Sequence, residues 1–339
     1  MTTQTSSKLK ATLALDAMSG DQGSVVVVAA AKSFLQTHIN ARLILVGDEA
    51  LLREQFGADH DRVEYLHATQ VVDMDESPVD ALRKKKQSSM RLAINLVKAG
   101  DADACVSAGN TGALMATAKY VLKMIRGIDR PAIMAEIPGK QGRVFLLDVG
   151  ANTSCTAEQL FQFAIMGSVV TARLTANATP RVALLNIGEE DIKGHQVIRE
   201  AADLIEQSSL HYVGFIEGNA LFSNTADVVV TDGFTGNVAL KTMEGTATLI
   251  GGFLKQSFSA GVLAKLQGLI ALPSLKRLQA RMDPRAYNGA SLVGLSGIVV
   301  KSHGGADAVA FEHAINAAVL EVQDNVPAEI NRRLNVGAD

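Results

Sequence analysis

Six short loops hold the residues whose types and spacing could do chemistry. Each loop combines glycine with Asn, Ser, Thr, Asp or His, and each follows a short apolar stretch. Glycine lets the backbone approach a ligand closely, and a following helix N-terminus offers unpaired N–H groups and a partial positive charge. Such loops suit an oxyanion, and phosphate is the natural ligand. The loops are DAMSGD (16–21), SAGNTG (107–112), DVGANT (148–153), NIGEE (186–190), TDGFTGN (231–237) and KSHGG (301–305).

Ordinary turn chemistry also places glycine at strand ends, so any one of these loops would be weak evidence. Their recurrence favours a shared ligand. The sequence contains no G-x-x-x-x-G-K-[ST] segment and no G-x-G-x-x-G after the first apolar stretch, so ATP and NAD sites lose support. It also lacks the G-x-S-x-G segment of serine hydrolases and any convincing metal-ligand spacing of His and acidic residues. We expect no metal and no cofactor.

The elements that must position these loops follow a βαβ rhythm, in which short runs of Val, Ile and Leu precede helical patterns. Several runs are apolar on both faces, as expected where helices cover both sides of a parallel sheet. The sequence therefore predicts an α/β fold with three layers and a mainly parallel sheet, whose six loops meet on one side of the molecule. The expected strands are 12–15, 43–46, 104–107, 133–137, 144–147, 182–185, 228–230 and 298–300, and one long helical pattern covers 79–98.

The segment 246–285 interrupts this rhythm and predicts a helical hairpin within a single catalytic domain of residues 1–339. Its turn is expected near Gly261, and Gly268 and Pro273 are expected to break the second arm. Apolar residues with cationic flanks are typical of a membrane surface, whereas a hairpin that packs in a dimer or in the core is the alternative. The basic residues are Lys255, Lys265, Lys276, Arg277, Arg281 and Arg285, and the apolar ones are Leu249, Ile250, Phe253, Leu254, Leu266, Leu269, Ile270, Leu275 and Leu278.

The composition excludes several function classes. The net charge of −3 and the aromatic content of 4% without Trp argue against a nucleic-acid partner. Two isolated cysteines indicate a reducing cytoplasm rather than a disulfide framework. The first ten residues are polar, and the sequence lacks an apolar stretch of the length that a spanning helix needs. We expect a cytoplasmic enzyme.

Together, the motifs resemble the PlsX family of bacterial phosphate acyltransferases, from about Leu13 to the helix after His303. The segments that carry the resemblance are 16–23, SAGNTGALMA (107–116), LDVGAN (147–152), NIGEEDIKG (186–194), DVVVTDGFTGNVALKTMEG (227–245) and YNGASLVGLSGIVVKSHG (287–304). The chain departs from the family pattern at Ser19, where a second glycine is usual, and at Ala220, where an acidic residue is common.

The resemblance implies conversion of long-chain acyl-[acyl-carrier-protein] and inorganic phosphate to acyl phosphate for phospholipid synthesis. It also implies a homodimer, a fold similar to phosphotransacetylases and the isocitrate dehydrogenase group, and peripheral association with the inner face of the cell membrane. A membrane glycerol-phosphate acyltransferase would take the product.

This reaction needs no covalent enzyme intermediate, because phosphate itself attacks the thioester. An ammonium group can neutralise the phosphate and then the developing oxyanion, and Lys193 is our first choice because of the resemblance; a surface lysine at a helix end is the alternative. We expect His303, Asn237 and Asp232 to join Lys193 in catalysis. The residues expected to bind phosphate or the acyl thioester are Asp16, Gly20, Ser107, Gly109, Asn110, Thr111, Asp148, Asn152, Gly188 and Glu189.

Each of these side chains also has a plainer interpretation. The asparagines, Ser107 and Thr111 could cap helices, and the aspartates could orient other groups, since a carboxylate aimed at phosphate would repel it. His303 could instead make a structural hydrogen bond. Cys155 is expected to be an inert thiol. The basic run Arg83–Lys86 could dock the acidic carrier protein, or it could be a solvated helix face.

Two rival functions remain open at the level of the sequence. The first is a phosphotransacetylase that uses acyl-CoA. The second is a non-catalytic, membrane-associated scaffold for lipid synthesis.

Overall fold

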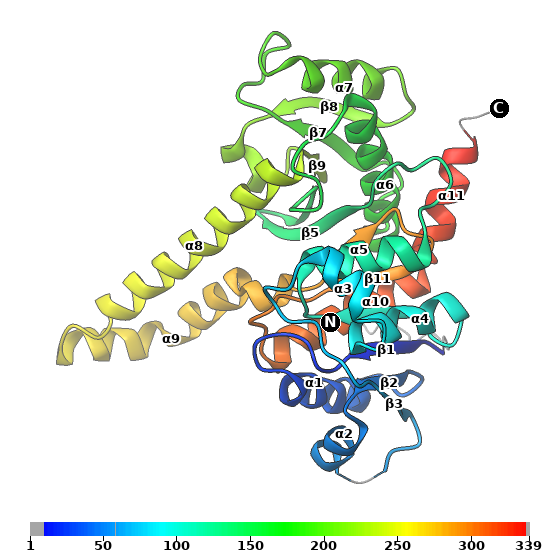
Figure 1. Ribbon diagram of the computed structural model, residues 1–339. Coiled ribbons are helices and arrows are strands. Elements are labelled where there is room, and N and C mark those ends of the chain that lie inside the picture. The colour runs from blue at the N-terminus through cyan, green and yellow to red at the C-terminus, as the bar shows by residue number, and fades with distance from the viewer. Residues whose placement is uncertain (1–9, 58, 337–339) are drawn as a thin grey trace.

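The computed structural model describes residues 10–57 and 59–336, except the side chains of 279–282, 335 and 336 (Figure 1). Its strands form one sheet in the order β3-β2-β1-β4-β11-β10-β5-β6-β9-β7-β8. The strands are β1 (Thr12–Asp16), β2 (Arg42–Gly47), β3 (Val63–His67), β4 (Ala104–Ser107), β5 (Ala132–Gly139), β6 (Gly142–Leu147), β7 (Arg181–Leu185), β8 (His211–Ile216), β9 (Val228–Val230), β10 (Ala290–Val293) and β11 (Ile298–Lys301).

The sheet consists of two parallel blocks that run in opposite directions. The strands β3, β2, β1, β4 and β11 are parallel to one another, and so are β6, β9, β7 and β8. Between the blocks, the pairs β11/β10, β10/β5 and β5/β6 are all antiparallel. Three reversals leave the second block pointing opposite to the first. The carboxyl ends of the two blocks therefore lie at opposite edges of the sheet.

Helices cover both faces of the sheet. On one face, α3, α4, α5 and the first turns of α8 pack over both blocks. On the other, α1, α2 and α10 cover the first block, while α6, α7 and α11 cover the second. The helices are α1 (Ser24–Thr37), α2 (Glu49–Phe56), α3 (Pro78–Lys84), α4 (Ser89–Ala99), α5 (Thr111–Leu122), α6 (Ala157–Thr175), α7 (Gln196–Glu206), α8 (Gly233–Ser257), α9 (Val262–Met282), α10 (Ala308–Gln323) and α11 (Val326–Val336), with 3₁₀ helices η1 (Gly218–Phe222) and η2 (Pro284–Tyr287).

The predicted three-layer α/β/α fold with a mainly parallel sheet is confirmed. All eight expected strands are present, and strands β3, β8 and β10 were missed. The edge strands β3 and β8 are only partly buried, so they lack the continuous apolar pattern of the others. The single helical pattern predicted over 79–98 was wrong, because the chain turns at 85–88. There the Ser88 hydroxyl donates to Lys85 O at 2.8 Å and caps α4 by accepting from Arg91 N.

The helical hairpin projects from the body of the molecule as α8 and α9 (Figure 1). Its turn lies between Ser257 and Val262, as predicted. The first arm begins at Gly233 rather than near 246, and the predicted break in the second arm is wrong, since α9 continues through Pro273. Leu249, Phe253 and Leu266 remain exposed, whereas the side chain of Arg281 lies outside the described residues. Within the described ranges, we find no helix with both the length and the apolar character needed to cross a membrane.

Candidate functional site

The six glycine-rich loops form two groups, and the expectation that they share one side was wrong. The first loop group (16–21, 107–112 and 301–305) follows β1, β4 and β11. The second loop group (148–153, 186–190 and 231–237) follows β6, β7 and β9. The two groups separate because the antiparallel strands between the blocks reverse the direction of the sheet. The site residues therefore have to be considered group by group.

The three loops of the first group touch through their backbones. Asp21 N donates to Gly304 O at 2.9 Å. Gly20 has a φ of +84°, and a Cβ at this position would lie 3.0 Å from both Ala108 Cβ and Gly304 O. Only glycine tolerates this conformation and this approach. Gly20 is thus the point where the three loops meet, and its predicted part in ligand binding stays a prediction.

Asp16 and Ser107 link the loops of the first group by buried hydrogen bonds. Asp16 is completely buried, and it accepts from Ser107 Oγ at 2.6 Å. Ser107 Oγ also accepts from Gly109 N at 3.1 Å. The hydroxyl of Ser19 donates to Asp16 O and accepts from Ala108 N, both at 3.1 Å. The unusual Ser19 therefore links two loops rather than disturbing them, and Asp16 and Ser107 act as supports.

Asn110 and Thr111 start α5 in the same group. Asn110 caps the helix by accepting from Ala113 N at 2.9 Å, and its amide donates to Met74 O at 2.7 Å and Glu76 O at 3.0 Å. These bonds tie the segment 71–76 over the first loop group. Thr111 is exposed at the first residue of α5. Gly109 is enclosed, since a Cβ there would lie 2.6 Å from Met90 Cε.

Lys301 is the residue that the sequence analysis missed. It ends β11, the strand of the first block that pairs with β10, and it is partly buried. Its Nζ donates to Ala108 O at 3.2 Å and to Ser302 O. Burial lowers the pKa of Lys301 to about 8; the nearby Asp16 raises it and Lys241 lowers it. The Lys301 ammonium group therefore lies against the backbone of the SAGNTG loop. It is well placed to attract an anion.

His303 lies two residues further along the same loop. Its backbone N–H donates to Asn288 Oδ1 at 2.9 Å, and its Nδ1 accepts from Gly305 N at 3.1 Å. A neutral ring therefore carries its proton on Nε2. Burial, followed by the charge of Lys241, lowers the pKa of His303. A neutral imidazole that carries its proton on Nε2 can donate to an oxyanion without adding a full charge.

In the second group, Asp148 and Asn152 are buried structural residues. The Asp148 carboxylate accepts from Ile133 N at 2.9 Å, from Ala151 N at 3.0 Å and from Asn152 N at 2.7 Å. The Asn152 amide donates to this carboxylate and to Pro131 O at 2.8 Å. The Asp148 carboxylate and the Asn152 amide nitrogen are thus both engaged by hydrogen bonds inside the protein. The structure supports the alternative of a supporting role for both residues over direct ligand binding.

Asp232 begins α8 as its N-cap, accepting from the backbone N–H and the hydroxyl of Thr235, both at 2.9 Å. This is the capping role that competed with catalysis in the sequence analysis. Cys155 is half-buried nearby. Burial, together with the charges of Asp148 and Asp232, raises its pKa to about 12. The prediction of an inert thiol is supported.

Lys193 belongs to the second group and is exposed. It lies in the turn before α7, which starts at Gln196. A Cβ at Gly188 would lie 2.9 Å from Lys193 Cγ and 2.7 Å from Glu190 Oε2, so this glycine lets the turn close. Glu189 is also exposed.

Helix α8 connects the two groups. It starts in the second group, where a Cβ at Gly150 would lie 3.7 Å from Asn237 Oδ1. One turn later Lys241 is close enough to the first group for its charge to lower the pKa values of Lys301 and His303. Residues four apart share one helix face, about 6 Å apart along the axis. Helix α8 therefore carries Asn237 beside the second group and Lys241 near Lys301 and His303 of the first.

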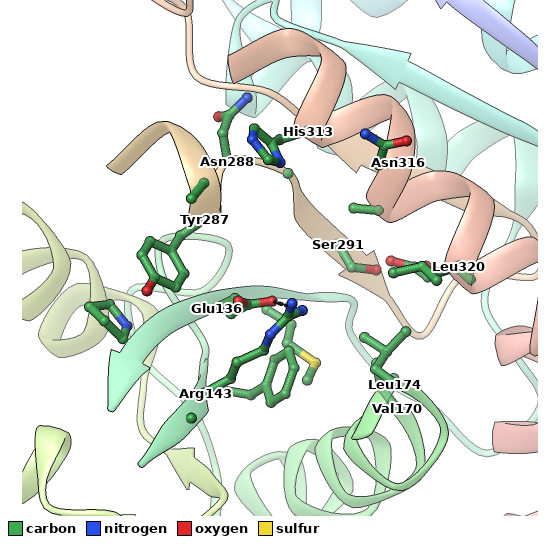
Figure 2. A pocket seen from close by; sticks show the side chains of 18 of the residues that line it. Glu136, Arg143, Val170, Leu174, Tyr287, Asn288, Ser291, His313, Asn316 and Leu320 are labelled. Atoms are coloured by element: carbon green, nitrogen blue, oxygen red, sulfur yellow. Dashed lines mark hydrogen bonds and ion pairs between the residues drawn. The ribbon is translucent and has the colours of Figure 1, made fainter. Parts of the chain in front are cut away.

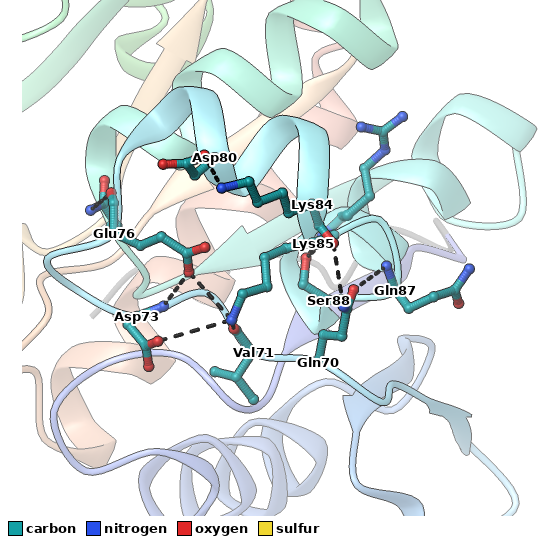
Figure 3. A network of polar contacts seen from close by, with 11 residues as sticks. Gln70, Val71, Asp73, Glu76, Asp80, Lys84, Lys85, Gln87 and Ser88 are labelled. Carbon is teal, nitrogen blue, oxygen red and sulfur yellow. Dashed lines mark hydrogen bonds and ion pairs between the residues drawn. The ribbon is translucent and has the colours of Figure 1, made fainter.

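The basic run before α4 is only partly available to a partner. Lys85 is half-buried, and its Nζ donates to Val71 O at 2.9 Å and lies 3.5 Å from Glu76 Oε2, as Figure 3 shows. Lys84 pairs with Asp80 at 2.8 Å but remains exposed. Lys85 and Asn110 thus both anchor the segment 71–76 by donating to its backbone carbonyl groups.

Comparison with known proteins agrees with this description. Residues 11–329 match the family model described as "Fatty acid synthesis protein". The phosphate acyltransferase of Methylococcus capsulatus is 54% identical, over 95% of this chain and 96% of that protein, and the phosphate acyltransferase of Alkalilimnicola ehrlichii is 56% identical over the same shares.

Among solved structures, a phosphotransacetylase from Streptococcus pyogenes is similar with a TM-score of 0.63 and 19% identity, covering 93% of this chain and 94% of that one. At this identity the likeness shows the fold alone, and it confirms the predicted fold class. The resemblance to the PlsX family and the prediction of an acyltransferase are confirmed by the relatives. The chain belongs to the family described as "Fatty acid synthesis protein", and the two relatives named above are phosphate acyltransferases.

Proposed function

We propose that this protein transfers a long-chain acyl group from acyl-[acyl-carrier-protein] to inorganic phosphate and so supplies acyl phosphate for phospholipid synthesis. The observation that carries the proposal is Lys301, a partly buried cation against the SAGNTG loop, with Lys241 and His303 close by. Their combined field favours a small dianion, and the N-terminus of α5 adds its partial positive charge. The names of the relatives support phosphate as the acyl acceptor.

In the proposed reaction, a phosphate oxygen attacks the thioester carbonyl carbon. The C–S bond then breaks, and the thiol leaves with the bonding electron pair and takes up a proton. Lys301 and Lys241 hold the phosphate, and the Nε2–H of His303 or the amide of Asn237 donates to the tetrahedral oxyanion. A thiol with a pKa near roughly 8.5 can leave as thiolate, so a strong acid is not required. Lys193, the first choice from the sequence, remains a candidate from the second loop group.

Exposed basic residues at the end of α3 and just after it support the carrier protein as the acyl source. Because Lys85 is engaged with the segment 71–76, a docking patch would consist of the exposed Arg83, Lys84 and Lys86. Charge reversal at Lys84 and Lys86 should raise the KM for the carrier-linked donor, while the KM for phosphate stays the same. An unchanged KM for the carrier would remove this patch.

The hairpin supports the proposed peripheral association with the inner face of the cell membrane. Exposed apolar side chains such as Leu263, Leu269 and Ile270 alternate with Lys265, Lys276 and Arg277. This combination suits a lipid surface with anionic headgroups. The same apolar side chains could also pack against a second copy of the chain in a homodimer. With the hairpin bound to the membrane, the downstream membrane acyltransferase would receive acyl phosphate without its release into water.

A phosphotransacetylase that uses acyl-CoA is the rival function. Purified protein is incubated with phosphate and either a carrier-linked or a CoA-linked long-chain acyl thioester, and acyl phosphate is measured. A large preference for the carrier supports the proposal, and a preference for CoA supports the rival. Absence of acyl phosphate with both donors would favour the scaffold.

A further inference from the structure

A groove of about 520 Å³ lies on the face of the sheet away from α8, between α6 and α10 (Figure 2). Its volume falls within the roughly 300–1,000 Å³ of small-molecule sites. Met134 of β5 and Phe145 of β6 line it. Val170, Leu174 and Leu320 form an apolar end. None of the predicted site residues lines it.

The rest of the groove is polar. Glu136 and Arg143 form an ion pair at 3.0 Å near Tyr287, as Figure 2 shows. Among the described residues, Asn316 Oδ1 is buried and accepts no hydrogen bond. Leaving a buried acceptor unsatisfied costs about 1–3 kcal/mol, so an N–H or O–H donor, from water or from a ligand in the groove, would stabilise this atom. A purely hydrocarbon ligand would not supply one.

One end of the groove adjoins the first loop group through Asn288. This residue lines the groove, and its amide donates to Ser302 Oγ at 2.8 Å. Its Oδ1 accepts from His303 N at 2.9 Å. The Asn288 amide also donates to Ala310 O at 2.7 Å, so this side chain separates the groove from the loop that holds His303 and Lys301.

We propose that this groove holds the phosphopantetheine arm of the acyl donor, with the thiol end at Asn288. The inference rests on the proposed function, since it supplies the thioester to that same site. The arm combines amide N–H groups, which suit Asn316, with methyl groups that suit the apolar lining. Its terminal phosphate suits Arg143, because Glu136 accepts from only one nitrogen of this guanidinium in the described structure. Carrier protein and coenzyme A share this arm, so either could be the source.

The test fills the groove by Ala317→Trp and compares two donors in the full-length protein. The first is a phosphopantetheine-linked acyl thioester, tested on the carrier and on coenzyme A. The second is the same acyl thioester of N-acetylcysteamine, which keeps only the thiol end of the arm. Ala317 lines the groove on α10, whereas Gln323 is exposed on the same helix outside it, so Gln323→Trp is the matched control.

We expect Ala317→Trp to raise the KM for both arm-bearing donors at least about tenfold and to leave turnover of the N-acetylcysteamine thioester unchanged. Equal effects on both kinds of donor, no effect, or an effect that depends on acyl-chain length would overturn the proposal. The ratio of the two arm-bearing KM values in the unmodified protein identifies the source.

Direct binding keeps the inference separate from the activity. Phosphopantetheine is titrated calorimetrically into the unmodified protein and into Asn316→Leu, a substitution of similar size that removes the acceptor. We expect about tenfold weaker binding by the variant. Binding without any acyl transfer would reject the proposed function alone, whereas equal binding by both proteins, or no binding, rejects the groove.

Discussion

Replacing Lys301 by Met should make the protein more stable and less active. Burial lowers the pKa of Lys301 from 10.5 to about 8. At about 1.4 kcal/mol for each pKa unit, holding this cation in the folded protein costs ~3 kcal/mol at neutral pH. The variant loses hydrogen bonds to Ala108 O and Ser302 O, at about 1 kcal/mol each. We therefore expect Lys301→Met to stabilise the fold by ~1 kcal/mol at pH 7.

The pH dependence gives the sharper test. The folded pKa of Lys301 lies below its unfolded pKa, so between pH 8 and 10.5 the unfolded state binds more protons and the stability of the unmodified protein rises. Lys301→Met lacks this contribution. Urea unfolding of both proteins at pH 7.5 and pH 10 should show the stability difference moving by about 2 to 3 kcal/mol in favour of the unmodified protein. Titrating groups that do not interact with Lys301 cancel in this difference.

Acyl phosphate formation, measured on the same samples, should fall at least about a hundredfold in Lys301→Met. Added phosphate should stabilise the unmodified protein more than the variant, because only the former offers the cation. If the stability difference is the same at both pH values, Lys301 is not a buried cation and the reasoning fails. If activity survives, Lys301 does not hold the phosphate.

Three further predictions concern other parts of the molecule. His303→Gln, which keeps a side-chain donor, should retain more turnover than His303→Ala, as steady-state kinetics at saturating phosphate can measure; equal losses would contradict a donor role. Lys85→Met should release the segment 71–76 and increase its amide hydrogen exchange, whereas Lys86→Met, its exposed neighbour, should not; identical exchange in both variants would show that Lys85 does not anchor the segment. Replacing Leu266, Leu269 and Ile270 by Ser should release the protein from liposomes containing anionic lipid, with unchanged circular dichroism; continued binding would exclude these side chains as the membrane contact.

The strands that are apolar on both faces were predictable because burial leaves a continuous pattern in the sequence. Strand β10 was not, since its four residues ASLV begin with small and polar side chains. This omission had a large effect. An antiparallel β10 contributes to the reversal of sheet direction, and without it all six loops appeared to share one edge.

The individual site residues were harder to predict than the loops. Asn110, predicted to bind the ligand, and Asp232, predicted to take part in catalysis, both cap helices, because a side-chain oxygen before a helix suits either role. Lys301 looked like an ordinary loop lysine. Its burial arises from β4 and β10 on either side of β11, and these contacts join segments far apart in the sequence.

The unbroken course of α8 sets a rotational phase between the site and the hairpin. Because each helical residue turns the chain by about 100°, one residue inserted between Lys241 and Leu249 would swing the apolar faces of the hairpin around the axis while Lys241 stays beside His303. The same insertion between Asn237 and Lys241 would instead turn the lysine away from the first loop group. The number of residues between Asn237, Lys241 and Leu249 therefore determines which side chains of α8 face the site and which face the hairpin surface.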